Sequence, residues 1–344
     1  MSKRNQWLLY GATGYSGERI AEKAVACGYK PVLAGRDAAK VKAVAERLGL
    51  DWHAISLDDA AGLKKLVADF PVVMHAAGPF VNTHQPMIEA CLTSGTHYLD
   101  ITGEIKVFED LAALDARARK AGIMMMPGCG FDMVPGDCLA LYLKRLMPDA
   151  ISMDIAVSFE GTLTRGSIKS SMANYTPDPL VRRSHKIVPL AGSAPREFDF
   201  GAGRCGGRHM TNVSTFGDIS VAWRTTGIPD ITVYIKPAPE FAALATLTGP
   251  SDVDRLPPGP SNDELANIPT VLIGEVRNSS GEARAARMVL PQVYAITFDL
   301  ASRIAQRVCE GMHRNGFQTP ASVFGEDYIL QFNGCSIEPW TAST

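Results

Sequence analysis

The chain has 344 residues, which is long enough for two domains that each bury a core. It carries 34 Lys and Arg against 36 Asp and Glu, a net charge of −2, and it has no basic block, so nucleic acid is not predicted as a partner. No stretch of about 20 residues lacks glycine, proline and charge, so the sequence predicts no membrane span.

The seven cysteines are scattered along the chain without a C-x-x-C pair, which predicts a reduced protein with no structural metal site. Residues 1–7, Met-Ser-Lys-Arg-Asn-Gln-Trp, offer no apolar signal core before the first apolar run. From these two observations we expect a cytoplasmic protein.

Three glycines spaced by three residues follow the first apolar run, residues 8–10, and a helical pattern begins directly after them. Glycine lets a backbone turn tightly and approach a diphosphate closely, and the amino end of a helix attracts negative charge. The pattern therefore predicts a strand, a dinucleotide-binding loop and a helix. The predicted cofactor-binding residues of this loop are Gly11, Thr13, Gly14, Tyr15, Ser16 and Gly17.

A second apolar strand, residues 31–34, ends at Gly35, Arg36 and Asp37. In a nucleotide-binding fold this position contacts the ribose of adenosine. The guanidinium of Arg36 suits a 2′-phosphate, so NADP is predicted in preference to NAD. Asp37 has two interpretations, a contact with the ribose hydroxyl or an N-cap for the helix predicted at residues 38–48.

An acidic pair, Asp58 and Asp59, follows a short strand predicted at residues 52–56. We predict that Asp58 lies beside the adenine, although the pair can equally cap the next helix. The strand that begins at residue 72 ends in a turn of small residues, Ala77, Gly78 and Pro79. Because ligands lie beyond the carboxyl ends of parallel strands, this turn is predicted to face the ribose of the nicotinamide.

Strands and helices alternate up to residue 126, and six strands are predicted in all. This alternation predicts an α/β fold, with a Rossmann-type doubly wound parallel sheet that binds NADP over residues 1–130. The helices expected after the third strand span residues 60–70, 84–94 and 107–121, and the last two strands span 96–101 and 123–126.

The pattern changes at residue 127, after which strands predominate. They are predicted at 152–159, 219–223, 231–235, 271–276 and 283–289. Residues 131–290 are therefore expected to form an inserted α+β domain, built on a mostly antiparallel sheet, for substrate and dimer contacts. Residues 291–344 are predicted as helices that pack back on the Rossmann domain.

Hydride chemistry belongs to the nicotinamide, so the protein must place the acceptor and supply a proton or a charge. A carboxyl in a dry cleft can pass a proton when its pKa is raised. The predicted catalytic residues are Tyr98, Asp100, Cys129 and Asp132, and Glu104 is a further candidate. The structural alternatives are that Asp100 ties down a turn, that Asp132 holds the loop at 129–135, and that Tyr98 packs in the core.

The sequence also contains GATGYSG at 11–17, AGPF at 77–80, GTHYLDITGE at 95–104, CGFDMVP at 129–135, TGIP at 226–229, PQVYAIT at 291–297 and GFQTPA at 316–321. These stretches resemble the saccharopine dehydrogenase-like oxidoreductases, which include trans-acting enoyl reductases. The resemblance implies an NADP-binding domain, an inserted substrate and dimerisation domain, and hence a homodimer. It also implies hydride transfer to a C=C or C=N bond of a small or acyl substrate, which it does not identify.

Other functions stay open. Gly128-Cys129 resembles the nucleophile turn of acyl-phosphate reductases, in which a cysteine forms a thioester, and His185 or His209 could activate the thiol. A free cysteine more often packs as a small apolar residue. The chain could also bind NADP(H) as a sensor or scaffold without catalysis. A short-chain dehydrogenase is not indicated, because the sequence has no Tyr-x-x-x-Lys pair.

Basic residues of the strand-rich region are candidates to hold a carboxylate or a phosphate of the substrate. They are Arg165, Lys169, Arg182, Arg183 and Arg224. Three aromatic residues, Trp223, Tyr234 and Tyr294, could shape an apolar pocket or pack in the core.

Overall fold

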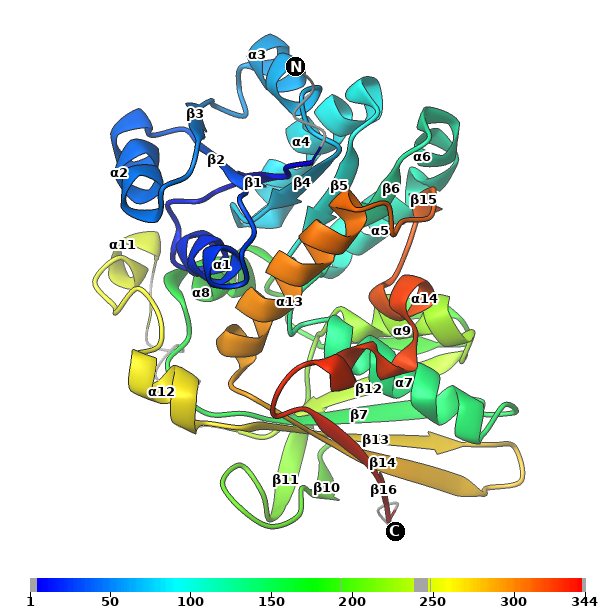
Figure 1. Cartoon of the computed structure of the whole chain (residues 1–344). Helices are drawn as coiled ribbons and strands as arrows, with labels where there is room; N and C mark the ends of the chain where they lie inside the picture. The colour runs from blue at the N-terminus through cyan, green and yellow to red at the C-terminus, as the bar shows by residue number, and fades with distance from the viewer. Residues whose placement is uncertain (1–4, 193, 238–246, 248, 342–344) are drawn as a thin grey trace. The chain divides into compact units, whose positions relative to one another are not determined.

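The computed structural model describes residues 5–192, 194–237, 247 and 249–341, so the first four residues of the amino-terminal stretch considered above lie outside the described residues. The chain divides into two compact units. The first contains the residues up to Gly130 together with Thr297–Gln318, and the second contains Phe131–Ile296 together with the residues from Thr319 on. Figure 1 labels most of their helices and strands.

The first unit is built on a seven-stranded sheet in the order β15-β6-β5-β4-β1-β2-β3, and every pairing in it is parallel. The strand order reverses between β1 and β4, as in a doubly wound sheet, which confirms the Rossmann-type prediction. Its strands are β1 (Leu8–Tyr10), β2 (Val32–Gly35), β3 (Trp52–Ala54), β4 (Val72–His75), β5 (His97–Asp100), β6 (Met124–Met126) and β15 (Gly316–Phe317). The last of these was not predicted.

Apolar residues of these strands and of the covering helices form the core of the unit. The helix predicted at 107–121 is in fact two helices, and the one predicted from residue 84 begins at Phe80. The helices are α1 (Tyr15–Ala26), α2 (Ala38–Leu48), α3 (Ala60–Val67), α4 (Phe80–Ser94), α5 (Ile105–Ala113), α6 (Asp115–Ala121) and α13 (Val293–Cys309), of which the residues from Thr297 on belong to this unit.

The second unit is built on a nine-stranded sheet in the order β10-β11-β12-β7-β13-β14-β16, with β8 paired to β12 and β9 paired to β8. Among the described strands of this second sheet, only the β7–β12 pairing is parallel, which confirms a mostly antiparallel sheet. The strands are β7 (Ser152–Ser158), β8 (Leu180–Arg183), β9 (Lys186–Pro189), β10 (Arg196–Asp199), β11 (Arg208–Val213), β12 (Asp230–Ile235), β13 (Thr270–Arg277), β14 (Ala283–Leu290) and β16 (Ser336–Trp340).

One face of this sheet packs against helix α7 (Val134–Leu146). A Cβ added to Gly274 of β13 would lie 2.5 Å from Cδ1 of Leu143, so the helix sits directly on that strand. Gly274 pairs with Ile155 of β7, and side chains alternate along a strand. Ile155 therefore points toward α7, and its neighbour Asp154 points to the opposite face.

Residues 219–223, predicted as a strand, belong instead to helix α9 (Asp218–Thr226). The prediction is wrong because a short apolar run satisfies both periodicities. Gly227 ends the helix in the left-handed region, with φ 72°, and its N–H bonds to the Trp223 carbonyl. The remaining helices of the unit are α8 (Arg165–Ala173), α11 (Pro250–Val253), α12 (Asn262–Asn267), α14 (Pro320–Phe324) and the 3₁₀ helix η1 (Glu326–Gln331).

The prediction that all of residues 291–344 pack on the Rossmann domain is wrong for the residues from Thr319 on, which belong to the second unit. β16 pairs with β14 and covers an edge that would otherwise offer unpaired backbone groups. Asp137 of α7 also accepts a hydrogen bond from the Ala321 N–H at 2.7 Å, which fixes α14 to the unit. These contacts join residues far apart in the chain, so local pattern gives no sign of them.

Candidate functional site

Each of the three positions in the first loop is occupied by glycine for a different structural reason. Gly11 has φ 89°, and a Cβ there would lie 2.7 Å from the backbone of Ala76 and Ala77. A Cβ on Gly17 would lie 2.2 Å from the Gly11 oxygen, so α1 passes the loop at backbone distance. Gly14 is exposed, and a Cβ there would meet only the Gly11 oxygen at 3.5 Å. The first two glycines shape the loop, while Gly14 leaves its outer side open to a ligand.

Gly14 is also the N-cap residue of α1, and within the described part of the chain no side chain caps this helix. The first N–H groups of a helix have no intrahelical acceptor, and the helix dipole adds partial positive charge. The ring of Tyr15 packs edge-on against Phe298, with ring centroids 6.0 Å apart, which holds the first turn. The end of α1 therefore has the form of a diphosphate cradle, with Thr13 and Ser16 beside it.

Arg36 is exposed directly after β2 and lies near the hydroxyl of Tyr10. That hydroxyl donates to the Ile55 carbonyl at 3.2 Å. Burial raises the pKa of Tyr10, the charge of Arg36 lowers it and the charge of Asp58 raises it, so the two predicted cofactor residues flank one tyrosine. This edge of the sheet therefore carries both a cation and an acid, at the positions where the sequence predicts contacts with adenosine.

The alternative interpretation of Asp37 is the one that the structure supports. Its carboxylate caps α2 by accepting from the Lys40 N–H at 3.1 Å. Asp59 does the same for α3 by accepting from the Gly62 N–H at 2.9 Å. Asp58 is exposed, and the hydroxyl of Ser56 donates to its carboxylate at 3.1 Å.

The turn at Ala77, Gly78 and Pro79 is held from two sides. The carboxylate of Glu104 accepts from the N–H groups of Phe80 and Val81, at 2.8 and 2.7 Å, and so caps α4. The hydroxyl of Thr83 donates to the Ala77 carbonyl at 2.6 Å. The sequence predicts Glu104 as a candidate but gives no sign of this capping role, because 24 residues separate the carboxylate from the first N–H.

Tyr98, Asp100 and Cys129 come together at the carboxyl ends of β5 and β6. Asp100 is buried, and its carboxylate accepts from the Tyr98 hydroxyl at 2.7 Å, from the Thr102 N–H at 2.9 Å and from the Gly128 N–H at 2.8 Å. Its backbone carbonyl accepts from the Cys129 N–H at 2.7 Å. Burial raises the pKa of Asp100 to about 7, although these hydrogen bonds oppose the rise.

The thiol of Cys129 is fully buried and donates to the Met126 carbonyl at 3.3 Å. Burial raises its pKa well above the ordinary value, and the nearby charge of Asp100 adds to the rise. A nucleophilic cysteine needs a lowered pKa and access to solvent. His185 accepts from the indole N–H of Trp223 at 3.1 Å, and His209 lies 2.8 Å from the Gly206 carbonyl, so each histidine has a local partner.

Asp132 belongs to the second unit, where it is half-buried and its charge acts on Asp218 and Tyr294. Asp218 is buried, and burial raises its pKa well above the ordinary value. Asp137 is buried beside it, and burial raises its pKa to about 6. The hydroxyl of Tyr294 accepts from the Thr164 N–H at 3.0 Å. Burial therefore favours the protonated forms of Asp137 and Asp218.

Most of the predicted basic residues have structural partners. Arg165 donates to the Leu256 carbonyl, Lys169 pairs with Asp254, and Arg224 donates to Ser220. Arg182 is buried against Trp223, with its guanidinium 4.1 Å from the ring centroid. Arg183 lines a cavity of the second unit.

Among the described residues, no three His, Cys, Asp or Glu side chains are arranged to hold a metal ion. In the same part of the chain, no helix combines the length and the apolar character needed to cross a bilayer.

Residues 7–126 match the family model of the saccharopine dehydrogenase NADP-binding domain. This match confirms the prediction of an NADP-binding domain and covers all the predicted cofactor residues named above. The loop geometry agrees with it, since Gly14 and the end of α1 leave room for the diphosphate of the dinucleotide.

Several mycobacterial proteins are similar to part of this chain. A protein named trans-acting enoyl reductase from Mycobacterium bovis (strain BCG) is 34% identical over 146 residues, which cover 40% of this chain and 35% of that protein. Rv2449c of Mycobacterium tuberculosis, which carries the same name provisionally, is 31% identical over 209 residues, 55% of this chain and 50% of that protein. The matches thus cover between a third and a half of these relatives' length.

A solved structure extends the likeness beyond the NADP-binding domain. Saccharopine dehydrogenase (L-Glu forming) from Saccharomyces cerevisiae aligns with 98% of this chain and 100% of its own, with a TM-score of 0.62 and 14% sequence identity. At this identity the match shows the fold alone, and it confirms the α/β architecture with a second, mixed sheet.

Alanine substitutions at two glycines of the NADP-binding domain should separate loop shape from ligand contact. Gly17→Ala forces a methyl group onto the Gly11 oxygen, so we expect the unfolding free energy to fall by about 1–3 kcal/mol and NADPH binding to be lost. Gly14→Ala has room, so the melting temperature should stay unchanged while NADPH affinity falls roughly tenfold or more. Calorimetry and thermal unfolding measure both. Unaltered NADPH affinity in Gly14→Ala would contradict the cradle.

Arg36→Gln should remove the preference for NADPH over NADH. A charged hydrogen-bonding contact with the 2′-phosphate contributes about 1.5–3 kcal/mol, so NADPH affinity should fall roughly 10- to 100-fold while NADH affinity stays the same. The control is Lys40→Gln, which removes an equal charge from an exposed residue of α2. A variant at Arg36 that still prefers NADPH would refute the assignment.

Asp100 should make the stability of the NADP-binding domain pH-dependent. Burial raises its pKa from the ordinary value of 3.8 to about 7, so between pH 4 and 7 the folded state keeps a proton that the unfolded chain has lost. The unfolding free energy should therefore fall as pH rises through this window, by at most about 1.4 kcal/mol per pH unit. Urea unfolding of wild type and Asp100→Asn measures the difference, and a difference that does not vary with pH would exclude this contribution.

Proposed function

We propose that this protein is an NADP-dependent oxidoreductase that transfers a hydride from NADPH to a C=C or C=N bond of a small or acyl substrate. The observation that carries the proposal is the diphosphate cradle at Gly14 and the end of α1, combined with an exposed Arg36 at the end of β2. A bound nicotinamide would supply the hydride, and the protein would supply binding, orientation and a proton.

The predicted cofactor residues take separate roles in this proposal. Thr13, Gly14, Tyr15 and Ser16 would hold the diphosphate at the end of α1, and Arg36 would bind the 2′-phosphate. Asp58 would lie on the adenine side. The turn at Ala77, Gly78 and Pro79 would meet the ribose of the nicotinamide, and Glu104 would keep it in place by capping α4.

Of the four predicted catalytic residues, we propose Asp132 as the proton donor. It is half-buried, and it lies near Asp218, whose burial favours the protonated form. Tyr98, Asp100 and Cys129 are buried and bonded to each other or to neighbouring backbone, so they are proposed to hold the loop at 127–130 rather than to touch substrate.

The mycobacterial relatives are named trans-acting enoyl reductases, which favours an enoyl group as the hydride acceptor and therefore an acyl substrate. The rival in which Cys129 forms a thioester is not favoured, because its thiol is buried and its pKa is raised. A sensor that binds NADP(H) without turnover is the second candidate, since the same cradle would serve it.

Two further features complete the proposal. The seven cysteines are all free thiols, which suits the reducing cytoplasm. A homodimer is proposed on the resemblance to the saccharopine dehydrogenase-like oxidoreductases described above.

A screen of NADPH oxidation tests the proposed activity, with 2-enoyl thioesters, cyclic imines, and 2-oxoglutarate plus amino acids as acceptors. With the active acceptor, Asp132→Asn should lower kcat by roughly 100-fold or more and leave the affinity for NADPH unchanged, because a general acid contributes that much. Asp178→Asn, at an exposed acid of the same unit, is the control.

Two results would count against the proposal. Full turnover by Asp132→Asn would remove this residue as the donor. NADPH binding without oxidation by any acceptor class would favour the sensor.

A further inference from the structure

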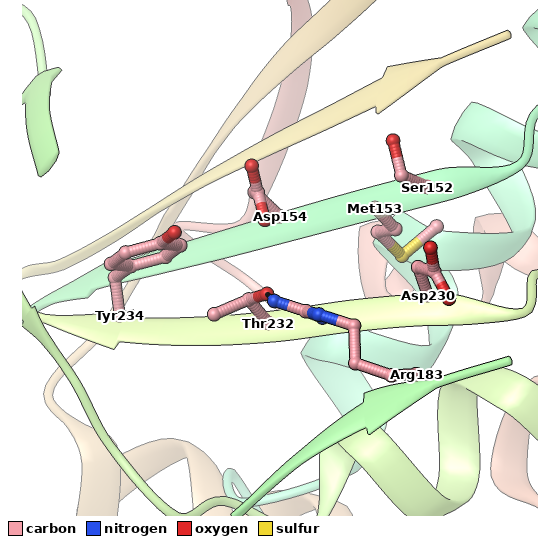
Figure 2. Close-up of a pocket in the computed structure, with 7 residues that line it drawn as sticks. All are labelled: Ser152, Met153, Asp154, Arg183, Asp230, Thr232 and Tyr234. Carbon is pink, nitrogen blue, oxygen red and sulfur yellow. Dashed lines mark hydrogen bonds between the residues drawn. The ribbon is translucent and has the colours of Figure 1, made fainter. Parts of the chain in front are cut away.

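The second unit carries a polar cavity of about 310 Å³ on the face of its sheet opposite α7. Strands β7, β8 and β12 contribute its walls, as Figure 2 shows. The polar residues that line it are Ser152, Asp154, Arg183, Asp230, Thr232 and Tyr234. Nothing in the proposed oxidoreductase activity uses these residues.

Strand alternation explains why Arg183 reaches this cavity although Arg182 does not. Arg182 pairs with Ile231, and its side chain stacks on Trp223 of α9. The next residue must point to the other face of the sheet. In Figure 2 the guanidinium of Arg183 lies beside Thr232, to whose hydroxyl it donates at 2.8 Å.

The guanidinium of Arg183 has donors left for a ligand. It donates to the carbonyls of Arg182 and Ile231, at 2.7 and 3.4 Å, as well as to Thr232. A guanidinium carries five N–H donors in a planar fork that matches a carboxylate. Within the described residues these three bonds therefore leave two of the five N–H donors without a protein acceptor.

Two carboxylates provide the opposite charge. Asp154 of β7 lies directly across from Thr232 of β12 in the sheet register, and Arg196 of β10 donates to it. Asp230 accepts from the Ser184 N–H at 2.7 Å. A carboxylate offers about four acceptor positions, so both acids can accept further hydrogen bonds.

The cavity therefore presents one cation, Arg183, and two acids, Asp154 and Asp230, of which Asp154 also pairs with Arg196 outside the lining. Asp154 and Asp230 would repel a dianion, and Arg183 would repel a simple cation. A volume of about 310 Å³ is near the lower end for ligand pockets, roughly 300–1,000 Å³, which suits a compact molecule.

We propose that this cavity binds a small zwitterion, with its carboxylate on the guanidinium of Arg183 and its ammonium facing Asp154 and Asp230. The site is a second ligand site, additional to the NADP-binding loop. It needs neither the proposed hydride transfer nor the proposed proton donor, so it can be tested with the full-length protein in the absence of NADPH.

Calorimetry with a series of simple probes tests the charge requirement. Glycine, β-alanine and γ-aminobutyrate place the carboxylate and the ammonium progressively further apart, while propionate and propylamine each carry one charge. At least one zwitterion should bind with a Kd of about 1 mM or tighter, and the single-charge probes should bind at least roughly tenfold more weakly. Binding of none of the zwitterions, or equal binding of propionate, would overturn the proposal.

Variants locate the site. Arg183→Gln should weaken binding of the preferred zwitterion at least roughly tenfold, because a charged contact is lost. Arg208→Gln, at an exposed arginine of β11, should not change it. Asp230→Asn is a second variant, since asparagine retains an oxygen for the Ser184 N–H. Both cavity variants should keep the melting temperature and the NADPH affinity of wild type.

Two outcomes would contradict the assignment to this cavity. One is unchanged zwitterion binding in both cavity variants. The other is a wild-type dimer, measured by light scattering, that Arg183→Gln dissociates, since this face would then be an interface between two copies of the chain.

Discussion

The passage of α1 beneath the Gly11 carbonyl is the contact on which the nucleotide site depends. A Cβ added at Gly17 would lie only 2.2 Å from that oxygen, so no residue with a side chain fits there without moving the helix. This approach fixes where the amino end of α1 stands relative to β1, and so where a diphosphate would meet both backbone N–H groups and the helix dipole. The proposed contacts of Arg36 and Asp58 with the cofactor depend on this position of the helix end.

Two acids at the end of β5 stabilise the neighbouring turns. Asp100 binds the backbone of the loop after β6, and Glu104 binds the backbone at the start of α4. Both carboxylates accept main-chain N–H groups, so their cost of burial is offset by hydrogen bonds. The turns around the proposed nicotinamide position are thus held before any ligand arrives, which limits the entropy lost on binding.

Local features of the sequence predicted a large part of this fold. The glycine loop, the helix at 38–48 and the strands at 271–276 and 283–289 are each specified by residues close in the chain, and the structure has them all. The failures involve distant partners. The short run at 219–223 satisfied two periodicities, and β16 pairs with a strand some 50 residues earlier. The partners of Glu104 and the separate environments of Arg182 and Arg183 also require the tertiary structure.

The carboxylate on the start of α4 has a consequence for charge at the sheet edge. Helices α1 and α4 follow the adjacent parallel strands β1 and β4, so both begin at the same edge. The carboxylate of Glu104 takes the place there of a bound anion and accepts hydrogen bonds from the first N–H groups of α4. The end of α1 has no such occupant among the described side chains. Among the described side chains, the positive end of α4 is thereby neutralised while that of α1 is not, so a phosphate at this edge would be attracted to α1 rather than to α4.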